Sequence, residues 1–280
     1  MKKLLCITLL LSSFAYANEM RLIKGGTFER SLRLLTVTKT IYRQKVSCSD
    51  FLISDTEVTI QEFYEFLKSE NRELPKDILK VHSKNDYKYF PIYYITFLDA
   101  VKFCNWKSLK ENFEPCYTIS NKIIEWNKNA SGYRLPTQTE WECAATNAGK
   151  DTEILSSDIN ILKKYCSVMT FIESCKYDTE DLLYIGRKIR GNKPNKNGLY
   201  DMLDNVAEFC WDYFQPDYYK NEIPDTNSPE ASKERVVKGG ICIVDESIQE
   251  EQISPVTWTY GLPENTNSRC IGFRVARNIN

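Results

Sequence analysis

Three short sequences of the type Thr-x-x-Glu or Thr-x-x-Asp constrain the fold of this chain more than any other feature. Thr59 precedes IQEFYEFLKS, Thr96 precedes FLDAVKFCNW, and Thr137 precedes QTEWECAA. In each, the threonine side chain can accept a hydrogen bond from the amide three residues on, while the acidic side chain at that position accepts one from the threonine's backbone amide, which is a capping box. We therefore expect a helix to begin at each threonine.

Strand-like runs lie on both sides of these helix starts. Residues 20–53 contain LIKGGTF, LLTVTKTIY and FLIS, and the last third contains RVVKGGICIV, VTWTYG and GFRVARN. Such β-branched and aromatic runs, broken by glycine and polar residues, are typical of strands. After Thr59 the period changes, and Ile60, Phe63, Phe66 and Leu67 share one helical face. The pattern predicts an α+β fold with short helices and long loops.

The first residues have the pattern of a secretory signal peptide. Two lysines precede the apolar run LLCITLLL, and AYA follows as a small-residue cleavage site. We expect residues 1–17 to be removed and residues 18–280 to be exported, as a periplasmic or secreted protein. The run is shorter than the roughly 20 residues that span a bilayer, so no transmembrane segment is expected after cleavage. No Gly/Ser-rich or Pro-rich linker follows, which favours a single domain for residues 18–280.

Charge and histidine content exclude several classes of site. The formal net charge is -1, so no basic surplus exists to attract nucleic acid. His82 is the single histidine, and it lies in the polar stretch KVHSKND. Iron sites with two histidines, His-Glu-x-x-His zinc sites and multi-histidine copper sites need ligands that this chain lacks. No Gly-x-Ser-x-Gly sequence accompanies His82, which we expect to be exposed and without a catalytic role.

The cysteines are consistent with an oxidising compartment. The chain has 10 cysteines, of which Cys6 lies within the expected signal peptide. In an exported protein most of the others should form disulfide bonds, and their odd number leaves one thiol free or bonded to another chain. The sequence does not give their connectivity. The absence of a Cys-x-x-Cys sequence disfavours a zinc ribbon or a thioredoxin-type site.

Six segments, in order, resemble the formylglycine-generating enzyme family, also called the sulfatase-modifying factor domain. They are SDTEVTIQEFYEFL, FPIYYITFLDAVKFCNW, GYRLPTQTEWECAA, NGLYDMLDNVAEFCWDYF, RVVKGG and GFRVARN. The pairing of RLPTQTEWE with GLYDM is highly specific, and the resemblance covers roughly Met20 to Arg277. It implies a variant of the C-type lectin-like fold, with small antiparallel sheets, short helices and much irregular structure.

The segment GLYDMLDNVAEFCWD places four acidic side chains among apolar and aromatic residues. Family members bind a structural calcium ion here. The resemblance therefore implies side-chain ligands from Asp201 and Glu208 and backbone carbonyl ligands from Asp204 and Val206, although the family usually has glycine where Asp204 stands. Calcium takes about six to eight oxygen ligands of mixed kind. The alternative is that Asp204 or Asn205 caps a short helix while the other acids face water.

The oxidation chemistry of the family is not expected to persist. Members oxidise a cysteine of a client sulfatase with oxygen and a copper(I) ion, which two cysteines hold after the Gly-Gly of the KGG segment, and a serine directly follows that segment. Here Ile241 stands at the serine position, and Val244 and Gln249 stand at the cysteine positions. Copper binding is therefore not expected. Cys242 and Cys270 are weak catalytic candidates as a displaced pair, and a disulfide or core role is their alternative.

Two functions follow from this pattern. The first is a catalytically degenerate family member that serves as a binding or assembly module outside the cytoplasm, with a protein, peptide or carbohydrate ligand. Its aromatic loop DYFQPDYYKN, residues 212–221, can either stack on such a ligand or pack internally. The second is an oxygen-dependent oxidoreductase that modifies a protein cysteine through Cys242 and Cys270. A hydrolase with paired carboxylates is a third class, but nothing singles out a pair among 38 acidic residues.

Overall fold

The structure is a computed structural model that describes seven stretches of the chain. They are residues 18–34, 41–121, 123–166, 187–220, 232–240, 254–268 and 270–279. The expected signal peptide, residues 1–17, lies outside the described residues, as does the segment 241–253 with Cys242. No helix among the described stretches is long and apolar enough to cross a membrane.

Three helices begin where the capping boxes predict. The side chains of Thr59, Thr96 and Thr137 each accept a hydrogen bond from the amide three residues on, and the acidic side chain there accepts one from the cap backbone. All three predicted helix starts are therefore confirmed. The helices of the described residues are α1 Ile60–Ser69, α2 Lys76–Val81, α3 Phe97–Lys110, α4 Gln138–Thr146 and α5 Ile159–Leu162, with 3-10 turns η1 Pro216–Lys220 and η3 Pro255–Thr257.

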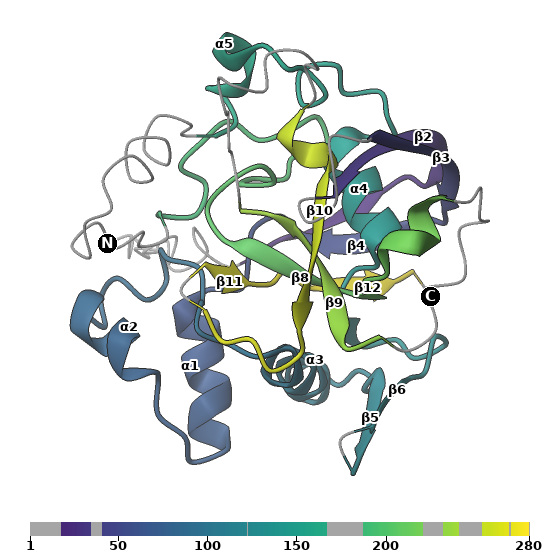
Figure 1. Cartoon of the computed structure of the whole chain (residues 1–280). Helices are drawn as coiled ribbons and strands as arrows, with labels where there is room; N and C mark the ends of the chain where they lie inside the picture. The colour runs from purple at the N-terminus through teal and green to yellow at the C-terminus, as the bar shows by residue number, and fades with distance from the viewer. Residues whose placement is uncertain are drawn as a thin grey trace, which may run out of the picture.

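The strands form two main sheets and a separate hairpin (Figure 1). The larger sheet has the order β11-β8-β9-β10-β2-β3, the smaller has β1-β4-β12-β7, and β5 pairs with β6. Most pairings are antiparallel, but β10 with β2 and β11 with β8 are parallel. The bounds are β1 Met20–Ile23, β2 Gly26–Leu34, β3 Ile41–Cys48, β4 Phe51–Ser54, β5 Tyr117–Ser120, β6 Ile123–Trp126, β7 Tyr133–Arg134, β8 Ala207–Tyr213, β9 Glu234–Gly239, β10 Trp258–Pro263, β11 Ile271–Gly272 and β12 Ala276–Asn278.

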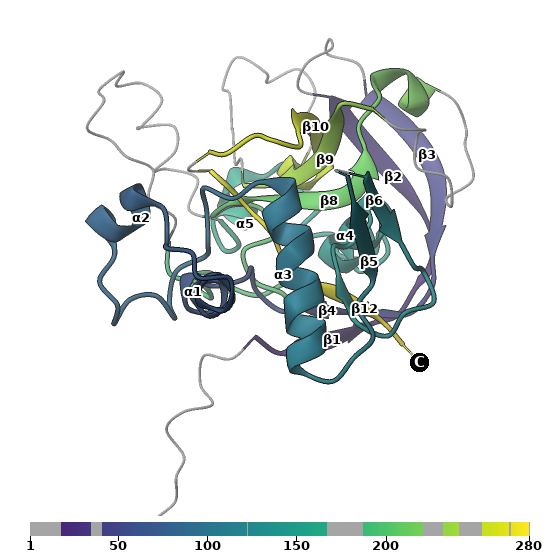
Figure 2. The same ribbon diagram turned by 90° about the horizontal axis from the view of Figure 1, so that it is seen from below.

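Aromatic side chains join α1 to α3, which lie side by side in both ribbon views (Figure 2). Phe63 of α1 stacks on Phe103 of α3 with ring centroids 5.7 Å apart, and Phe273 packs edge-on against both rings. The predicted apolar face of α1, which includes Phe63, is buried. Burial of such rings stabilises each by about 1.5 to 3 kcal/mol relative to exposure.

Helix α4 packs in the other half of the core. It contacts β2 and β3 on one side and β8 and β9 on another. Seven of its residues besides Trp141 are buried, among them Glu142, Cys143 and the alanines that follow. A helix that is buried on most of its surface must satisfy its polar side chains internally. The side chains of α4 therefore make both packing and polar contacts, and the helix positions the candidate site.

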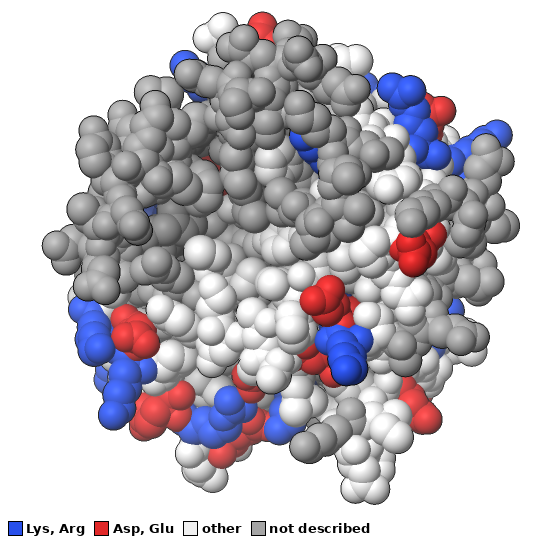
Figure 3. Space-filling model, in the orientation of Figure 1, with Lys and Arg blue, Asp and Glu red and all other residues white. Residues whose placement is uncertain are grey.

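Charged side chains of both signs are interspersed on the face that Figure 3 shows. They lie mainly along its lower rim, while the described centre of this face is mostly uncharged (Figure 3). Exposed ion pairs such as Lys110–Glu65 and Lys80–Asp77 belong to the helices α1 to α3. Mixed charge of this kind produces no field of one sign over the described part of this face.

We expect the variant Thr137→Ala to lower the free energy of unfolding by about 1 kcal/mol, because the hydrogen bond from the Glu140 amide to the cap is lost. Urea denaturation followed by circular dichroism measures this change. Thr118→Ala, at an exposed position of β5, is the control and should leave stability unchanged. Equal losses in both variants would contradict the structural role of the cap.

Candidate functional site

The acidic loop, Gly198–Glu208, is held inside the protein by backbone conformation and hydrogen bonds. Gly198 and Asp201 have φ values of 77° and 59°, a left-handed conformation that aspartate tolerates better than most residues. The Asp201 carboxylate accepts a hydrogen bond of 2.8 Å from the amide of Arg190. The loop runs directly into β8, and Asp201, Asp204 and Glu208 are buried. The alternative of a capped helix with acids facing water is therefore wrong.

Glu208 is neutralised by a buried arginine. Its two oxygens accept hydrogen bonds of 2.6 and 2.7 Å from Arg274, and the indole nitrogen of Trp141 donates another at 2.8 Å. Arg274 also donates to the carbonyls of Ser54 and Tyr200. Burial would lower the pKa of Arg274, but the Glu208 charge outweighs it and raises that pKa. The ion pair is thus fully formed and shielded from water.

Glu57 adds a second buried carboxylate beside this pair. It is 0% exposed, and neither of its oxygens receives a hydrogen bond from another described residue. Burial and the charge of Asp201 raise its pKa well above the ordinary value. Burial and the neighbouring Asp204 raise the pKa of Asp201 to about 7. Among the described residues, Arg274 and the backbone amide of Arg190 oppose these charges, so the cluster holds more carboxylates than cationic side chains and favours either a proton or a cation.

The donor chemistry of this cluster suits a hard cation, since it offers carboxylate and carbonyl oxygens. Within the described stretches no group of three or more His, Cys, Asp or Glu is arranged to hold a metal ion. The ligand set expected from Asp201, Asp204, Val206 and Glu208 is of another kind, with two side chains and two backbone carbonyls. Glu57 was not among the expected residues, although the sequence places it directly before the first capping box.

The KGG segment ends against the acidic loop. Gly239 and Gly240 both have a φ of 68°, and a Cβ atom on Gly240 would lie 2.1 Å from the amide nitrogen of Ala207. That amide donates a hydrogen bond of 2.8 Å to the carbonyl of Cys270. Half-buried Cys270 therefore lies near the point where the chain enters residues 241–253. Residues 241–253 contain Cys242, so the predicted pairing of Cys242 with Cys270 lies outside the described residues.

A family model described as "Sulfatase-modifying factor enzyme 1-like domain" matches residues 11–279. The chain belongs to this family. The similar curated proteins include the chaperone protein LppX of Paenibacillus barcinonensis, 29% identical over 70% of this chain and 72% of that protein. The formylglycine-generating enzyme of Thermomonospora curvata is 32% identical over 44% of this chain and 45% of that enzyme, so the match spans less than half of the enzyme.

Solved structures share the fold of this sulfatase-modifying factor domain. Treponema denticola variable protein 1 has a TM-score of 0.69 at 24% identity and covers 93% of this chain and 95% of its own. PvdO from Pseudomonas aeruginosa has a TM-score of 0.61 at 18% identity and covers 95% and 96%. At these identities the likeness concerns the fold alone. The predicted α+β fold of the formylglycine-generating enzyme type is confirmed.

A second buried polar cluster in this family member lies on the other side of α4. The Lys238 amine donates to the Glu142 carboxylate at 3.0 Å and to the Thr259 hydroxyl at 2.9 Å. Arg30 lies 3.4 Å from the other oxygen of Glu142. Burial would raise the pKa of Glu142, but the two cations, Lys238 first, lower it. Two basic side chains thus share the carboxylate of Glu142, and burial lowers the pKa of Lys238.

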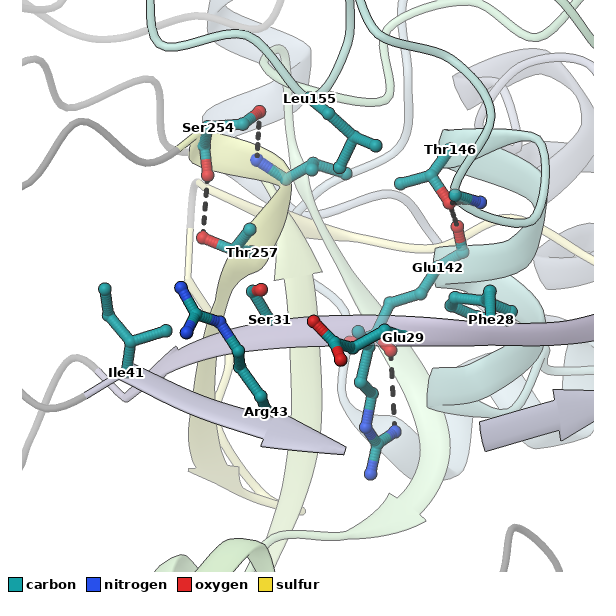
Figure 4. Close-up of a pocket in the computed structure, with 13 residues that line it drawn as sticks. Phe28, Glu29, Ser31, Ile41, Arg43, Glu142, Thr146, Leu155, Ser254 and Thr257 are labelled. Carbon is teal, nitrogen blue, oxygen red and sulfur yellow. Dashed lines mark hydrogen bonds and ion pairs between the residues drawn. The ribbon is translucent and has the colours of Figure 1, made fainter. Parts of the chain in front are cut away.

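A cavity of about 310 Å³ adjoins this basic cluster (Figure 4). Ile41 and Arg43 enter it from β3, Glu142 and Thr146 from α4, and Ser254 and Thr257 from the segment that ends in η3. Its volume is at the lower end of the range for small-ligand pockets. Apolar side chains, hydroxyl groups, two arginines and two glutamates line the same space. It can therefore accommodate a side chain or a small group with both apolar and charged parts.

The expectation that His82 is exposed is wrong. His82 is 6% exposed rather than exposed, because it ends α2 and turns its ring onto Phe90, with Nε2 3.0 Å from the Tyr93 hydroxyl. Burial lowers its pKa.

In the aromatic loop, Phe214 and Tyr219 are buried, and the Tyr219 hydroxyl donates to the side chain of Gln138. These two rings therefore pack inside the protein and do not form an exposed surface on which a ligand could stack.

No disulfide bond joins any two of the seven cysteines within the described residues, which include Cys104, Cys116 and Cys270. Burial raises the pKa of the Cys104 and Cys116 thiols. Since the thiolate is the reactive form, these two buried thiols behave as core residues.

We expect Glu208→Gln to lower the free energy of unfolding by about 3 to 5 kcal/mol, because it leaves Arg274 as an uncompensated buried charge. Urea denaturation followed by tryptophan fluorescence measures the change. The control is Asp77→Asn, which removes an exposed partner of Lys80 and should have little effect. A Glu208→Gln protein as stable as this control would show that the ion pair is dispensable.

Proposed function

We propose that this chain is a catalytically degenerate member of its family, which binds a protein or peptide outside the cytoplasm. The observation that carries this proposal is the set of residues after Gly240. Ile241 stands at the serine position and Val244 and Gln249 stand at the two copper-ligand positions that the family resemblance implies. Neither an isoleucine nor a valine side chain can bind copper(I) or hydrogen-bond a peptide.

The name of one relative supports a protein rather than a carbohydrate ligand. LppX is called a chaperone protein, and 72% of its length is matched by this chain. A chaperone recognises a polypeptide, and a cavity that is both apolar and charged suits a peptide side chain. Arg43 has no ion-pair partner in the described residues and enters that cavity, where it can bind a carboxylate.

The second candidate is a protein-modifying oxidase that uses Cys242 and Cys270. It is favoured by the position of Cys270, whose carbonyl is bonded to Ala207, the residue on which Gly240 packs. Two thiols at this place could bind a soft metal ion. The two functions differ in one measurable property, which is whether a bound peptide changes in mass.

We expect a fluorescently labelled peptide with a sulfatase-type cysteine motif to bind without any change in mass when oxygen, copper(I) and a reductant are supplied. Arg43→Gln should weaken binding about tenfold, because it removes a charged hydrogen bond. Fluorescence anisotropy measures binding, and mass spectrometry of the same samples measures oxidation.

Lys45→Gln is the matched control, since Lys45 is exposed on the same strand but does not line the cavity. A loss of peptide mass that disappears in Cys242→Ser would favour the oxidase. Binding of oligosaccharides in place of peptides, with no effect of Arg43→Gln, would overturn the peptide proposal and leave a carbohydrate ligand.

We also propose that the acidic loop binds a structural calcium ion through the side chains of Asp201 and Glu208 and the carbonyls of Asp204 and Val206. The excess of acid over base around Glu57 supports a cation there. Asp201 forms no ion pair with a lysine or arginine among the described residues, so it is the more available of the two anionic ligands. Glu208 shares its oxygens with Arg274 and Trp141.

Calcium at about 100 times its dissociation constant should raise the Tm by about 5 to 10 °C over the value in chelator, because it binds only the native state. Asp201→Asn should abolish this shift, and asparagine tolerates the left-handed backbone at this position. Scanning calorimetry gives both values. Glu73→Gln, an exposed acid on the same chain, should respond like the parent. A parent protein with equal Tm in chelator and calcium would refute the site.

A further inference from the structure

Two cysteines that lie far apart in the sequence meet where β3 ends beside α4. Cys48 is the last residue of β3, and Cys143 lies in the middle of α4. Both lie against the segment that leads into β2, since Cys143 Sγ is 3.9 Å from the carbonyl oxygen of Lys24 and Cys48 is the ladder partner of Gly26. Cys143 is fully buried, whereas Cys48 is half-buried and packs against the same hydrophobic cluster. Cys48 is therefore the more exposed residue of the two.

The backbone around the pair is closely packed. Gly26 lies opposite Cys48 in the β2–β3 ladder, and Cys143 Sγ is 3.9 Å from the carbonyl of Lys24. A Cβ atom on Gly25 would lie 2.2 Å from the carbonyl oxygen of Cys48, so only glycine fits there. Because β2, β3 and α4 are all tightly packed at this point, the two side chains are kept in contact by the fold rather than by chance rotation.

The thiols of Cys116 and Cys166 donate to backbone carbonyls of Gly132 and Leu162 at 3.3 and 3.4 Å. The Cys143 side chain, followed by burial, raises the pKa of Cys48. A thiol attacks a disulfide only as its thiolate, so oxidation of this pair is slow and needs a disulfide donor.

We propose that Cys48 and Cys143 form a disulfide bond that ties the end of β3 to α4. The Cys48 thiolate attacks a small-molecule or protein disulfide donor, forms a mixed disulfide and releases one donor thiol. The Cys143 thiolate then attacks Cys48 Sγ and releases the second donor thiol. Two electrons and two protons pass from the protein to the donor, which is thereby reduced.

This cross-link acts on the part of the core that positions both polar clusters. Cys143 follows Trp141 and Glu142, which reach the acidic loop and the basic cluster respectively. A bond from Cys143 to β3 fixes α4 against the strand that supplies Arg43 to the cavity. It also closes a long loop in the unfolded chain, which stabilises the folded protein. The proposal does not depend on the proposed ligand or on calcium.

The test uses the full-length protein incubated with oxidised glutathione, alkylated at low pH and digested without reduction. We expect a cross-linked pair of peptides that contains Cys48 and Cys143, and a Tm about 5 to 15 °C above that of the reduced protein. Mass spectrometry and scanning calorimetry give the two readouts. A reductant should reverse both.

Two variants separate this bond from other cysteine chemistry. Cys48→Ser should remove the cross-linked peptides, and Cys143 should then remain alkylated as a free thiol. Cys270→Ser, at another half-buried cysteine, should retain the link. The proposal is overturned if both Cys48 and Cys143 are recovered as alkylated thiols after oxidation, or if either is joined to a different cysteine.

Discussion

The buried ion pair between Glu208 and Arg274 holds together segments from the whole length of the chain. Glu208 lies on β8, and Arg274 precedes β12 and donates to the carbonyls of Ser54 and Tyr200. Trp141 adds α4 to the same group. Neither charge can leave its partner without a large desolvation penalty, so these segments have one arrangement relative to each other. The position of the acidic loop, which precedes Glu208, follows from this constraint.

Helix α4 separates two buried polar clusters, an acidic one and one in which two basic side chains share a carboxylate. Trp141 faces the acidic group of Glu57, Asp201 and Glu208, and its neighbour Glu142 faces Lys238 and Arg30. Successive residues of a helix point in directions about 100° apart, so adjacent side chains can serve different clusters. A helix with this double role cannot rotate or slide without disturbing both clusters. This explains why its start is fixed by a full capping box in addition to the packing of its apolar side chains.

Local features could be predicted from the sequence, and distant pairings could not. A capping box needs only residues three apart, so the starts of α1, α3 and α4 follow from Thr59, Thr96 and Thr137. Glu57 gave no such signal, because its environment is made by Asp201 and Arg274 from distant segments. The exposure of His82 was predicted wrongly for the same reason. Its sequence neighbours are polar, while Phe90 and Tyr93 bury it. The contact between two cysteines on β3 and α4 likewise depends on the completed fold.

The KGG segment has a sufficient explanation in packing. A side chain on Gly240 would collide with the backbone of Ala207, and a Cβ atom on Gly239 would lie 3.1 Å from the Met202 carbonyl and from the Trp141 ring. Both glycines also adopt a left-handed φ. Lys238 is held by Glu142 in the core. The segment is therefore required by the fold whether or not copper chemistry follows it. Substitutions after Gly240 can remove a reaction while the scaffold, with its acidic loop and its cavity beside α4, keeps its shape.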